Sequence, residues 1–298
     1  CSSDLTWAAL RGAMNAAGTG VRLIGMDVRV DSLDVRTLGA VAKAADSLRG
    51  RLEGRLTLDG PTKDLTFHDL ALAHVAGRKP RSFVRGSGRI ATDLTTRWLE
   101  ANLALDTIAL VTLAADRVNL PLRGTLAGSL RLSATADTLG LDLTLRGGGS
   151  EARVAGTTLL DSTRSVMRLE GSVRGFDAGA FIARRDLPPM RVDGALSLET
   201  DESAGVVDRH LAVRLDSTSR VGDARIHAGI VKVGVDDEGF HLDTADVRGA
   251  GWTLNGRGRL ARHADDAGDS VTFAAAFDSL GVLRSVLLDS TEIGRAHV

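Results

Sequence analysis

The chain has 298 residues, of which 43% are hydrophobic and 25% charged, and its formal net charge is −1. This apolar content can fill the core of one large or two ordinary domains and excludes a disordered chain. The evenly balanced charge argues against a basic patch for nucleic acid, and one cysteine excludes both an intrachain disulfide framework and a cysteine-based zinc site.

Aromatic residues are scarce, at 3% of the chain with no tyrosine. Sugar-binding sites, platforms for single-stranded nucleic acid and the girdles of outer-membrane barrels all depend on aromatic side chains. The most apolar run, Ile108–Ala115, is far shorter than the about 20 residues that a membrane-spanning helix needs. We therefore expect the chain to build an aliphatic surface and no membrane-spanning helix.

Alternation of apolar and polar residues with a period of two dominates the chain and predicts strands with one dry and one wet face. In chain order, this pattern covers Ile24–Val30, Val84–Ile90, Leu99–Leu105, Leu122–Asp137, Leu139–Leu145, Met167–Val173, Leu211–Leu215 and Phe240–Leu242. The phase of the alternation slips at Asp106–Thr107 and at Ile230–Val231. Such slips predict β-bulges or bends at these two places.

Four segments have helical spacing instead. Apolar residues recur at three- and four-residue intervals in Leu5–Met14, Leu38–Leu48, Ala178–Ile182 and Leu280–Leu287. The third of these is ended by Pro188-Pro189, and Asp278-Ser279 before the fourth could cap it. The sequence thus predicts short helices placed between runs of strands.

Internal repetition connects these elements. The segment Leu48–Leu58 aligns without gaps to Leu122–Leu132, and Met190–Leu198 is a third copy. Units beginning near residues 33, 122 and 176 differ in length, which argues against a solenoid of fixed rung size. We predict a mainly β fold, an elongated and curved antiparallel sheet with a groove, that runs continuously over residues 21–288.

Glycines recur in the leucine phase of these repeats, as in Gly124 and Gly128. A glycine weakens a strand, but it gives a crowded concave face room to bend. The alternative is that each glycine only marks a bulge. Curvature is favoured because the glycine returns in the same slot of each copy.

We make separate predictions for the two ends of the chain. Residues 1–20 are expected to form a short helix and a connecting segment, and residues 289–298 to be an artefactual tail, because Glu292–Val298 reads like a translated sequencing adapter. The chain is then expected to be a fragment of a longer protein. In the alternative interpretation, Cys1 is the lipidated N-terminus of a mature lipoprotein.

Catalytic and metal-binding patterns are weak. Gly86–Ala91 resembles part of a dinucleotide fingerprint but no helix follows it, and no nucleophile elbow or paired carboxylates are marked. His68, Asp69 and His74 are a candidate metal cluster, but period two puts both histidines on one strand face about 20 Å apart. We therefore expect no enzyme activity, no cofactor and no metal.

The leucines of two neighbouring predicted strands are the candidate site. If a long curved sheet does not close, its aliphatic face leaves a trough that is unstable in water unless something occupies it. Acyl chains suit such a trough, since each buried methylene contributes about 0.8 kcal/mol. The residues expected to line this lipid groove are Leu126, Leu130, Leu132, Leu141, Leu143 and Leu145.

The recurrent strand Leu-x-Gly-x-Leu-x-Gly-x-Leu-x-Leu, with short apolar stripes such as Leu38–Leu48 between strand runs, resembles the TamB/AsmA-like family of bacterial envelope proteins. The resemblance covers most of residues 20–288. It implies a taco-shaped β-sheet, a place in the periplasm with an inner-membrane anchor outside this chain, and phospholipid movement between the inner and outer membranes or support of outer-membrane assembly. It also implies an outer-membrane barrel partner, although the family segment that contacts the barrel is missing here. The family has no catalytic residues to transfer.

Two other functions remain open. A closed all-β binding domain of a lipoprotein or adhesin would bury the same leucines in a sealed core. A β-solenoid enzyme acting on polysaccharide would need equal rungs and an aromatic, carboxylate-rich cleft, which the unequal units and scarce aromatics disfavour.

Overall fold

A computed structural model describes residues 8–17, 20–35, 50–93, 96–113, 122–135, 137–160, 164–183, 187–203, 206–235, 239–261 and 270–278. These residues form an antiparallel sheet of 17 strands with two one-turn helices, so the predicted mainly β fold is confirmed. The chain divides into two compact units. Unit 1 comprises residues 1–148 and 180–183, and unit 2 comprises residues 149–179 and 184–298.

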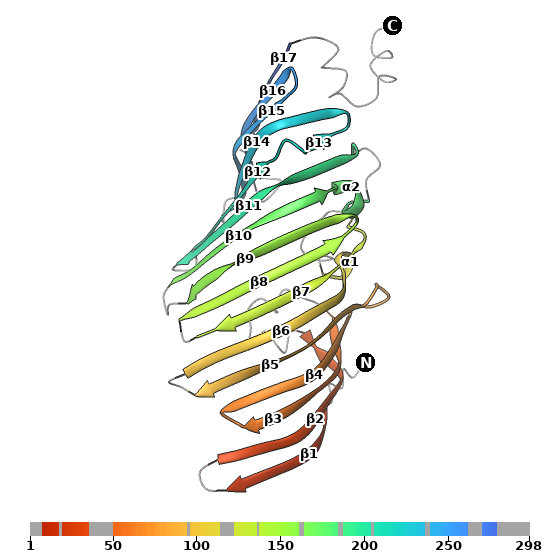
Figure 1. Ribbon diagram of the computed structural model, residues 1–298, viewed down its shortest axis with the longest axis vertical. Coiled ribbons are helices and arrows are strands. Elements are labelled where there is room, and N and C mark those ends of the chain that lie inside the picture. Colours follow the sequence, from red (N-terminus) through yellow and green to blue (C-terminus); the bar gives the residue numbers. More distant parts are fainter. Residues whose placement is uncertain are drawn as a thin grey trace. The chain divides into compact units, whose positions relative to one another are not determined.

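In unit 1, each strand pairs with the next one in the chain, and the strands lie side by side in chain order in Figure 1. They are β1 (Ala8–Ala17), β2 (Gly20–Asp34), β3 (Arg51–Pro61), β4 (Asp64–Val75), β5 (Ser82–Asp93), β6 (Thr96–Ala109), β7 (Thr125–Ala134) and β8 (Thr138–Gly147). Helix α1 (Leu110–Leu113) follows β6.

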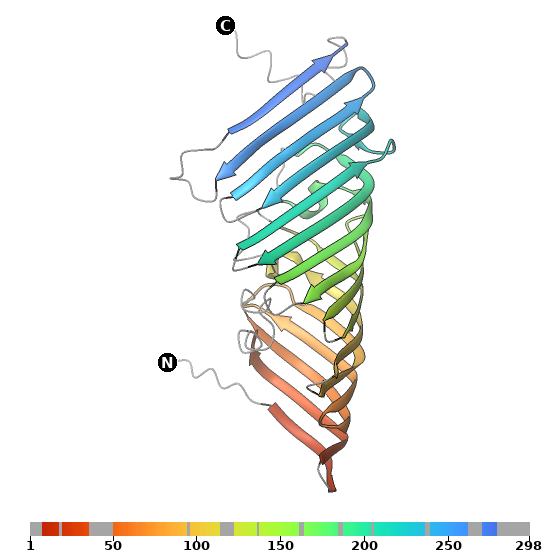
Figure 2. The same cartoon turned by 90° about the vertical axis from the view of Figure 1, so that its left-hand side faces the viewer.

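In unit 2, the strands also follow one another, and Figure 2 shows β14 to β17 as a row of neighbouring arrows. They are β9 (Ser150–Leu160), β10 (Arg164–Phe176), β11 (Met190–Ser203), β12 (Val206–Leu215), β13 (Arg220–Val221), β14 (Ala224–Val235), β15 (Gly239–Gly249), β16 (Trp252–Ala261) and β17 (Ser270–Phe277). Helix α2 (Ala178–Phe181) follows β10, and the short β13 pairs with β11 and β14 beside the main ladder.

The two ends of the strands in unit 1 have different connections. At one end, residues 62–63, 94–95 and 135–137 join neighbouring strands. At the opposite end, the longer segments 35–50 and 110–124 connect them, and the second of these contains α1. We call the first of these ends of unit 1 the hairpin end and the second the long-connection end.

Most of the predicted strands are confirmed, but one predicted helix is wrong. Residues 8–17 form strand β1, which makes nine cross-strand pairs with β2 along the edge of the sheet, in place of the helix expected from the spacing in Leu5–Met14. Pairing with a neighbour has overridden a short local pattern. The helix expected at Ala178–Ile182 is confirmed as α2, whereas Leu38–Leu48 and Leu280–Leu287 lie outside the described residues.

Of the two expected bulges, one is confirmed. The β6–β7 register shifts between Leu105 and Ile108, where the alternation slips. The second expected bulge is wrong, because the β14–β15 register runs through Ile230 and Val231 without a shift. Ile230 instead points to the polar face, and the register shifts of this pair lie on either side of it, between Ile226 and Ala228 and between Lys232 and Val233.

Glycines on the apolar side of the strands stand where neighbouring backbones and large side chains come close. A Cβ on Gly88 would lie 2.5 Å from Cζ of the Phe67 ring and would also press on the carbonyl oxygen of Glu100. A Cβ on Gly128 would overlap the carbonyl oxygen of Thr144 on the next strand. These close approaches support the interpretation that the glycines make room on a crowded, bent face.

We predict that Gly88→Ala lowers the free energy of unfolding by about 1–3 kcal/mol, because the new methyl group must displace the Phe67 ring or the backbone of β6. Gly20→Ala is the matched control, since a Cβ there meets nothing within 4 Å and the change should stay within about 0.5 kcal/mol. Urea denaturation followed by circular dichroism measures both. Equal effects of the two substitutions would contradict the packing role of Gly88.

Candidate functional site

The apolar side chains of unit 1 are aligned across its strands by the pairing register. Leu72 on β4 pairs with Val84 on β5, and Val84 pairs with Leu105 on β6. Residues directly opposite in an antiparallel pair point to the same face, so each such row extends one apolar surface. We call this surface the apolar face of unit 1; it includes Val28, Leu56, Leu58, Phe67, Leu72, Val84, Ile90, Leu99, Leu103, Leu105, Leu130, Leu132, Leu141 and Leu143.

The six leucines predicted as groove lining belong to β7 and β8. Leu130 pairs with Leu143, and Leu132 pairs with Leu141. Leu145 lies opposite Gly128, a member of the leucine phase of β7, and Leu126 lies further along the same phase. The register therefore brings the six side chains to one face. All six are half-buried, which is neither the state of a sealed core nor that of a fully wet surface.

Unit 2 has an apolar face of its own, built in the same way. Leu198 on β11 pairs with Leu169 on β10 and with Leu211 on β12, and Leu211 pairs with Val233 on β14. We call this surface the apolar face of unit 2; it includes Leu169, Leu196, Leu198, Leu211, Val213, Leu215, Ile226, Val231, Val233, Phe240, Leu242, Val247, Trp252, Leu254, Phe273 and Phe277.

Burial on the apolar face of unit 2 falls from one end of the strands to the other. At the end of the strands next to residues 216–223, Ile226, Val247 and Trp252 form a packed cluster together with Ala224. Toward the opposite end, Phe240 on β15 is 54% exposed, against 7% for Val247 on the same strand, and Phe273 on β17 is 59% exposed. The face is therefore covered at one end and open at the other.

In unit 1, a group of buried residues also lies at the long-connection end, apart from the buried Met26, Phe67 and Ala101 of the apolar face. Val35, Val75 and Ala109 are buried there, and the Ala109 amide donates a 3.0 Å hydrogen bond to the Ser82 hydroxyl. The Thr112 hydroxyl of α1 donates to the carbonyl oxygen of Pro80, at 2.6 Å, and so ties two connections together. Farther along the strands, the leucines stay half-buried and Ile90 is exposed.

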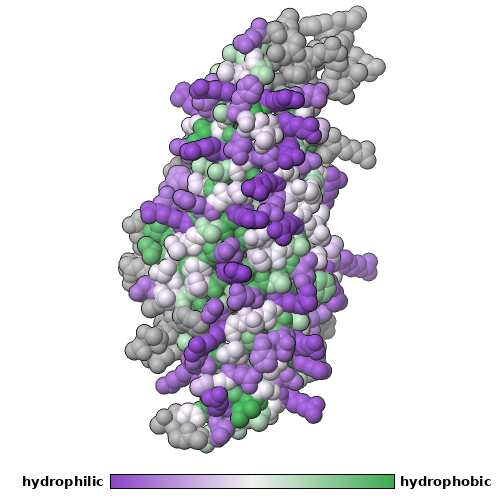
Figure 3. Space-filling model, viewed as in Figure 1, coloured by the Kyte–Doolittle hydropathy of each residue, from purple (hydrophilic) through white to green (hydrophobic). Residues whose placement is uncertain are grey.

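The opposite face of unit 1 carries charged side chains in cross-strand ion pairs. Arg85 on β5 donates to Asp106 on β6, with 2.8 Å between Nη2 and Oδ1, and Arg89 donates to Asp64 on β4, with 2.6 Å between Nε and Oδ1. These hydrogen bonds lower the pKa of both carboxyls. Figure 3 shows many hydrophilic side chains on the face seen there, with hydrophobic ones visible between them. Exposed pairs of this kind contribute little stability and mainly keep this face wet.

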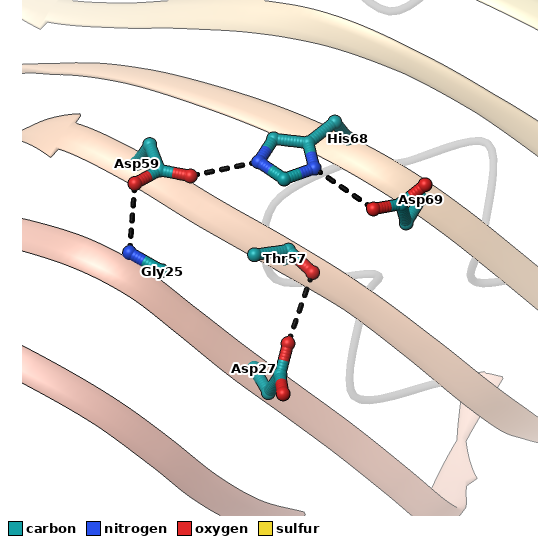
Figure 4. Close-up of polar contacts among 6 residues, drawn as sticks. All are labelled: Gly25, Asp27, Thr57, Asp59, His68 and Asp69. Atoms are coloured by element: carbon teal, nitrogen blue, oxygen red, sulfur yellow. Dashed lines mark hydrogen bonds and ion pairs between the residues drawn. The ribbon is translucent and has the colours of Figure 1, made fainter.

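A denser polar cluster on the same face centres on His68 (Figure 4). Its Nε2 lies 2.7 Å from Oδ2 of Asp59, and its Nδ1 lies 3.0 Å from Oδ2 of Asp69. The other oxygen of Asp59 accepts a 2.7 Å hydrogen bond from the Gly25 amide. Hydrogen bonds to Asp59 and then Asp69 raise the pKa of His68, and the bonds from Gly25 and His68 lower the pKa of Asp59.

The expectation that His68 and His74 share a strand face is wrong. His68 pairs with Thr57 on the polar side of β3, whereas His74 pairs with Leu52 on the apolar side. The β4–β5 register shifts between Phe67 and Leu70, and this bulge reverses the alternation between the two histidines. Within the described part of the chain, no group of three or more metal-ligating side chains is arranged to hold an ion.

A buried carboxylate in unit 2 is a feature that the sequence interpretation missed. Asp193 accepts hydrogen bonds from the Gly175 amide at 2.6 Å and from Nε of Arg191 at 2.9 Å, and its backbone exchanges hydrogen bonds with the hydroxyl of Ser219. Burial raises the pKa of Asp193, but the bonds from Arg191, Gly175 and Thr218 outweigh it and lower the pKa overall. The carboxylate thereby joins the end of β10, the start of β11 and the turn that contains Thr218.

A search of the described helices for a segment long and apolar enough to cross a bilayer found none. Comparison of the chain with models of known protein families, with curated proteins and with solved structures found no match. The candidate site is therefore defined by geometry alone: two aliphatic faces, each of which has buried positions and also half-buried or exposed apolar positions along the same strands.

We predict that Asp193→Asn destabilises unit 2 by about 1–3 kcal/mol, because it removes the charge that pairs with Arg191 inside a buried network. Because the pKa of Asp193 is lowered on folding, its contribution is fully present above the unfolded pKa of about 3.9 and is lost as the pH falls through the folded pKa. The variant should therefore lose part of the acid sensitivity of unfolding. Thermal unfolding between pH 3 and 7 measures this, with the exposed Asp223→Asn as control; identical acid profiles for the D193N variant and the parent would contradict the assignment.

Proposed function

We propose that this protein is a non-enzymatic lipid-transport protein, whose apolar sheet faces hold the acyl chains of phospholipids while the headgroups stay in water. The observation that carries the proposal is the half-burial of leucines that the register nonetheless gathers on one face, such as Leu130, Leu132, Leu141 and Leu143. In a sealed core, large aliphatic side chains of this kind would be buried. An open aliphatic surface over several strands is the feature of a site for an apolar ligand.

The chemistry of the lining favours acyl chains over a rigid ligand. The faces are mainly Leu, Val and Ile, and few of their members offer an aromatic ring or a polar group to orient a specific molecule. Each methylene that leaves water for such a surface contributes about 0.8 kcal/mol, wherever along the face it lies. Affinity without a fixed position suits a chain that must slide.

The proposal includes a location and partners. Following the resemblance to TamB/AsmA-like proteins, we propose a periplasmic protein anchored to the inner membrane, with phospholipid passing between inner and outer membranes and an outer-membrane barrel as a possible partner. The polar face, with its cross-strand ion pairs, supports an aqueous surrounding on the side away from the lipid. Support of outer-membrane assembly is the second role within the same proposal.

Site-specific photo-cross-linking tests the proposal on the full chain. A benzophenone side chain placed at Leu130 should label acyl chains in vesicles of phosphatidylethanolamine and phosphatidylglycerol. The same probe at Ser129, an exposed neighbour on the opposite face of β7, should not. Equal labelling at both positions, or labelling at neither, would overturn the proposal.

A charge on the lining gives the second prediction for this face. Leu130→Asp should abolish lipid labelling from a probe at Leu143, its cross-strand partner, while circular dichroism keeps its strand signal, because water reaches a half-buried site. Ser129→Asp is the matched control and should change neither measurement. Loss of the folded signal in L130D but not in S129D would mean that Leu130 fills a sealed interior, where an unpaired charge is too costly to bury. The protein would then be the closed binding domain.

A further inference from the structure

Two bulges meet at a single residue of β3. The β2–β3 register shifts between Leu23 and Met26, so that Gly25 lies in a bulge opposite Asp59. On the other side of β3, the β4–β5 register shifts between Phe67 and Leu70. Asp59 reaches both bulges, accepting from the Gly25 amide with one oxygen and facing His68 with the other.

The bulge on β4 is strained. Asp69 has a φ of 54°, in the left-handed region, where a residue other than glycine is held only by its surroundings. Its carboxylate lies 3.0 Å from Nδ1 of His68, the preceding residue. The side-chain network around His68 thus stabilises the conformation of the bulge in which His68 itself lies.

The geometry requires a particular protonation state of His68. A carboxylate can only accept hydrogen bonds, so both ring nitrogens must carry a proton to bond Asp59 and Asp69 at the same time. A neutral ring could keep only one of the two bonds. Both bonds can therefore form together only when the ring is an imidazolium; Figure 4 shows each ring nitrogen facing a carboxylate oxygen.

The charges around the ring come from all the strands packed beside it. On β2, Arg22 acts on Asp59, and Asp27 accepts a 3.0 Å hydrogen bond from the Thr57 hydroxyl. Arg29 on β2 and Arg55 on β3 line the same hollow as Asp69. On β5, Ser87 is neutral, and the arginines two residues away on either side, Arg85 and Arg89, are paired with carboxylates. The two carboxylates that bond to His68 therefore dominate its titration.

Directly behind this cluster, the apolar face of unit 1 is at its most covered in mid-sheet. Phe67 precedes His68 and points to the other side, where it pairs with Leu58 and lies over Gly88. Met26 and Phe67 on this row are 7% and 9% exposed, and Ala101 is 4% exposed, whereas the next position on β5 after Gly88, Ile90, is 39% exposed. We call the row Met26–Leu58–Phe67–Gly88–Ala101 the Phe67 row.

We propose that protonated His68 pins the two bulges together and thereby holds the Phe67 row closed, and that loss of the proton loosens both bulges and opens the row. The pinning of the two bulges by His68 does not depend on any ligand. The role of the Phe67 row as a proton-controlled constriction for an acyl chain on the apolar face rests on the proposed function.

The direction of the effect follows from linkage. Because the pKa of His68 is raised above its ordinary value of 6.5 on folding, the stabilisation is fully present below about pH 6.5 and is lost as the pH rises through the folded pKa. Acidic conditions should therefore favour the pinned, narrow state and alkaline conditions the loosened one.

Amide hydrogen exchange tests the pin without lipid. After correction for the intrinsic rate, exchange of the Gly25 amide should accelerate about threefold or more as the pH rises through the His68 titration followed by NMR. His68→Gln should show the fast exchange at every pH. His210→Gln, at an exposed histidine in unit 2 that lies 3.0 Å from Asp208, is the matched control and should keep the pH dependence. If the corrected exchange rate of the Gly25 amide does not change through the His68 titration, or is the same in H68Q and the parent, the proposed pinning by His68 is wrong.

Photo-cross-linking then tests the constriction. A benzophenone at Leu58 should label the acyl chains of phosphatidylethanolamine–phosphatidylglycerol vesicles more strongly above the His68 titration than below it. The pH dependence should vanish in H68Q, and labelling at Leu130 should not depend on pH. Lipid labelling at Leu130 with a pH-independent signal at Leu58 would overturn the constriction while leaving the groove intact. Failure to label at either position would refute the proposed function and, with it, the constriction, while the exchange experiment would still decide the pin.

Discussion

The structure depends on one constraint: in an antiparallel ladder, the residues that face each other across strands must point to the same side of the sheet. Because successive side chains alternate, a chain with leucine at every second position is obliged to build a face made of leucine. The consecutive pairing of β1 to β8 repeats this seven times in unit 1. The pairing of the strands therefore produces a large aliphatic surface, whatever covers it.

Burial is uneven over the two faces. The packed cluster around Ile226, Val247 and Trp252 in unit 2 lies at the end of the strands next to residues 216–223, whereas the buried Met26, Phe67 and Ala101 of unit 1 lie nearer the hairpin end. Among the described residues, the two one-turn helices are too short to form a second layer over either face. The half-buried and exposed apolar positions of the faces are the basis of the lipid proposal.

The sequence predicted what depends on the side-chain period and failed where partner strands decide. The apolar phase of β7 and β8 could be predicted because alternation alone determines which residues share a face. The strand at Ala8–Ala17 was missed because its spacing fits a helix and only its pairing with β2 settles the matter. Asp193 gave no local signal, since its burial depends on Ser219, 26 residues away in the chain.

The bulge at His68 shows the structural effect of a slip in the apolar–polar alternation of a strand. In β4, the apolar phase runs through Leu65 and Phe67 and resumes at Leu70 and Leu72, where the β4–β5 register shifts; the prediction from the sequence missed this slip because it assumed an unbroken period of two. A slip places two consecutive side chains, His68 and Asp69, on the polar face, where a regular strand would present one. That extra side chain is what allows a histidine to be bonded by a carboxylate from its own strand and another from its neighbour. The irregularity that interrupts the aliphatic pattern is therefore also what gives a uniform sheet a place that can respond to a proton.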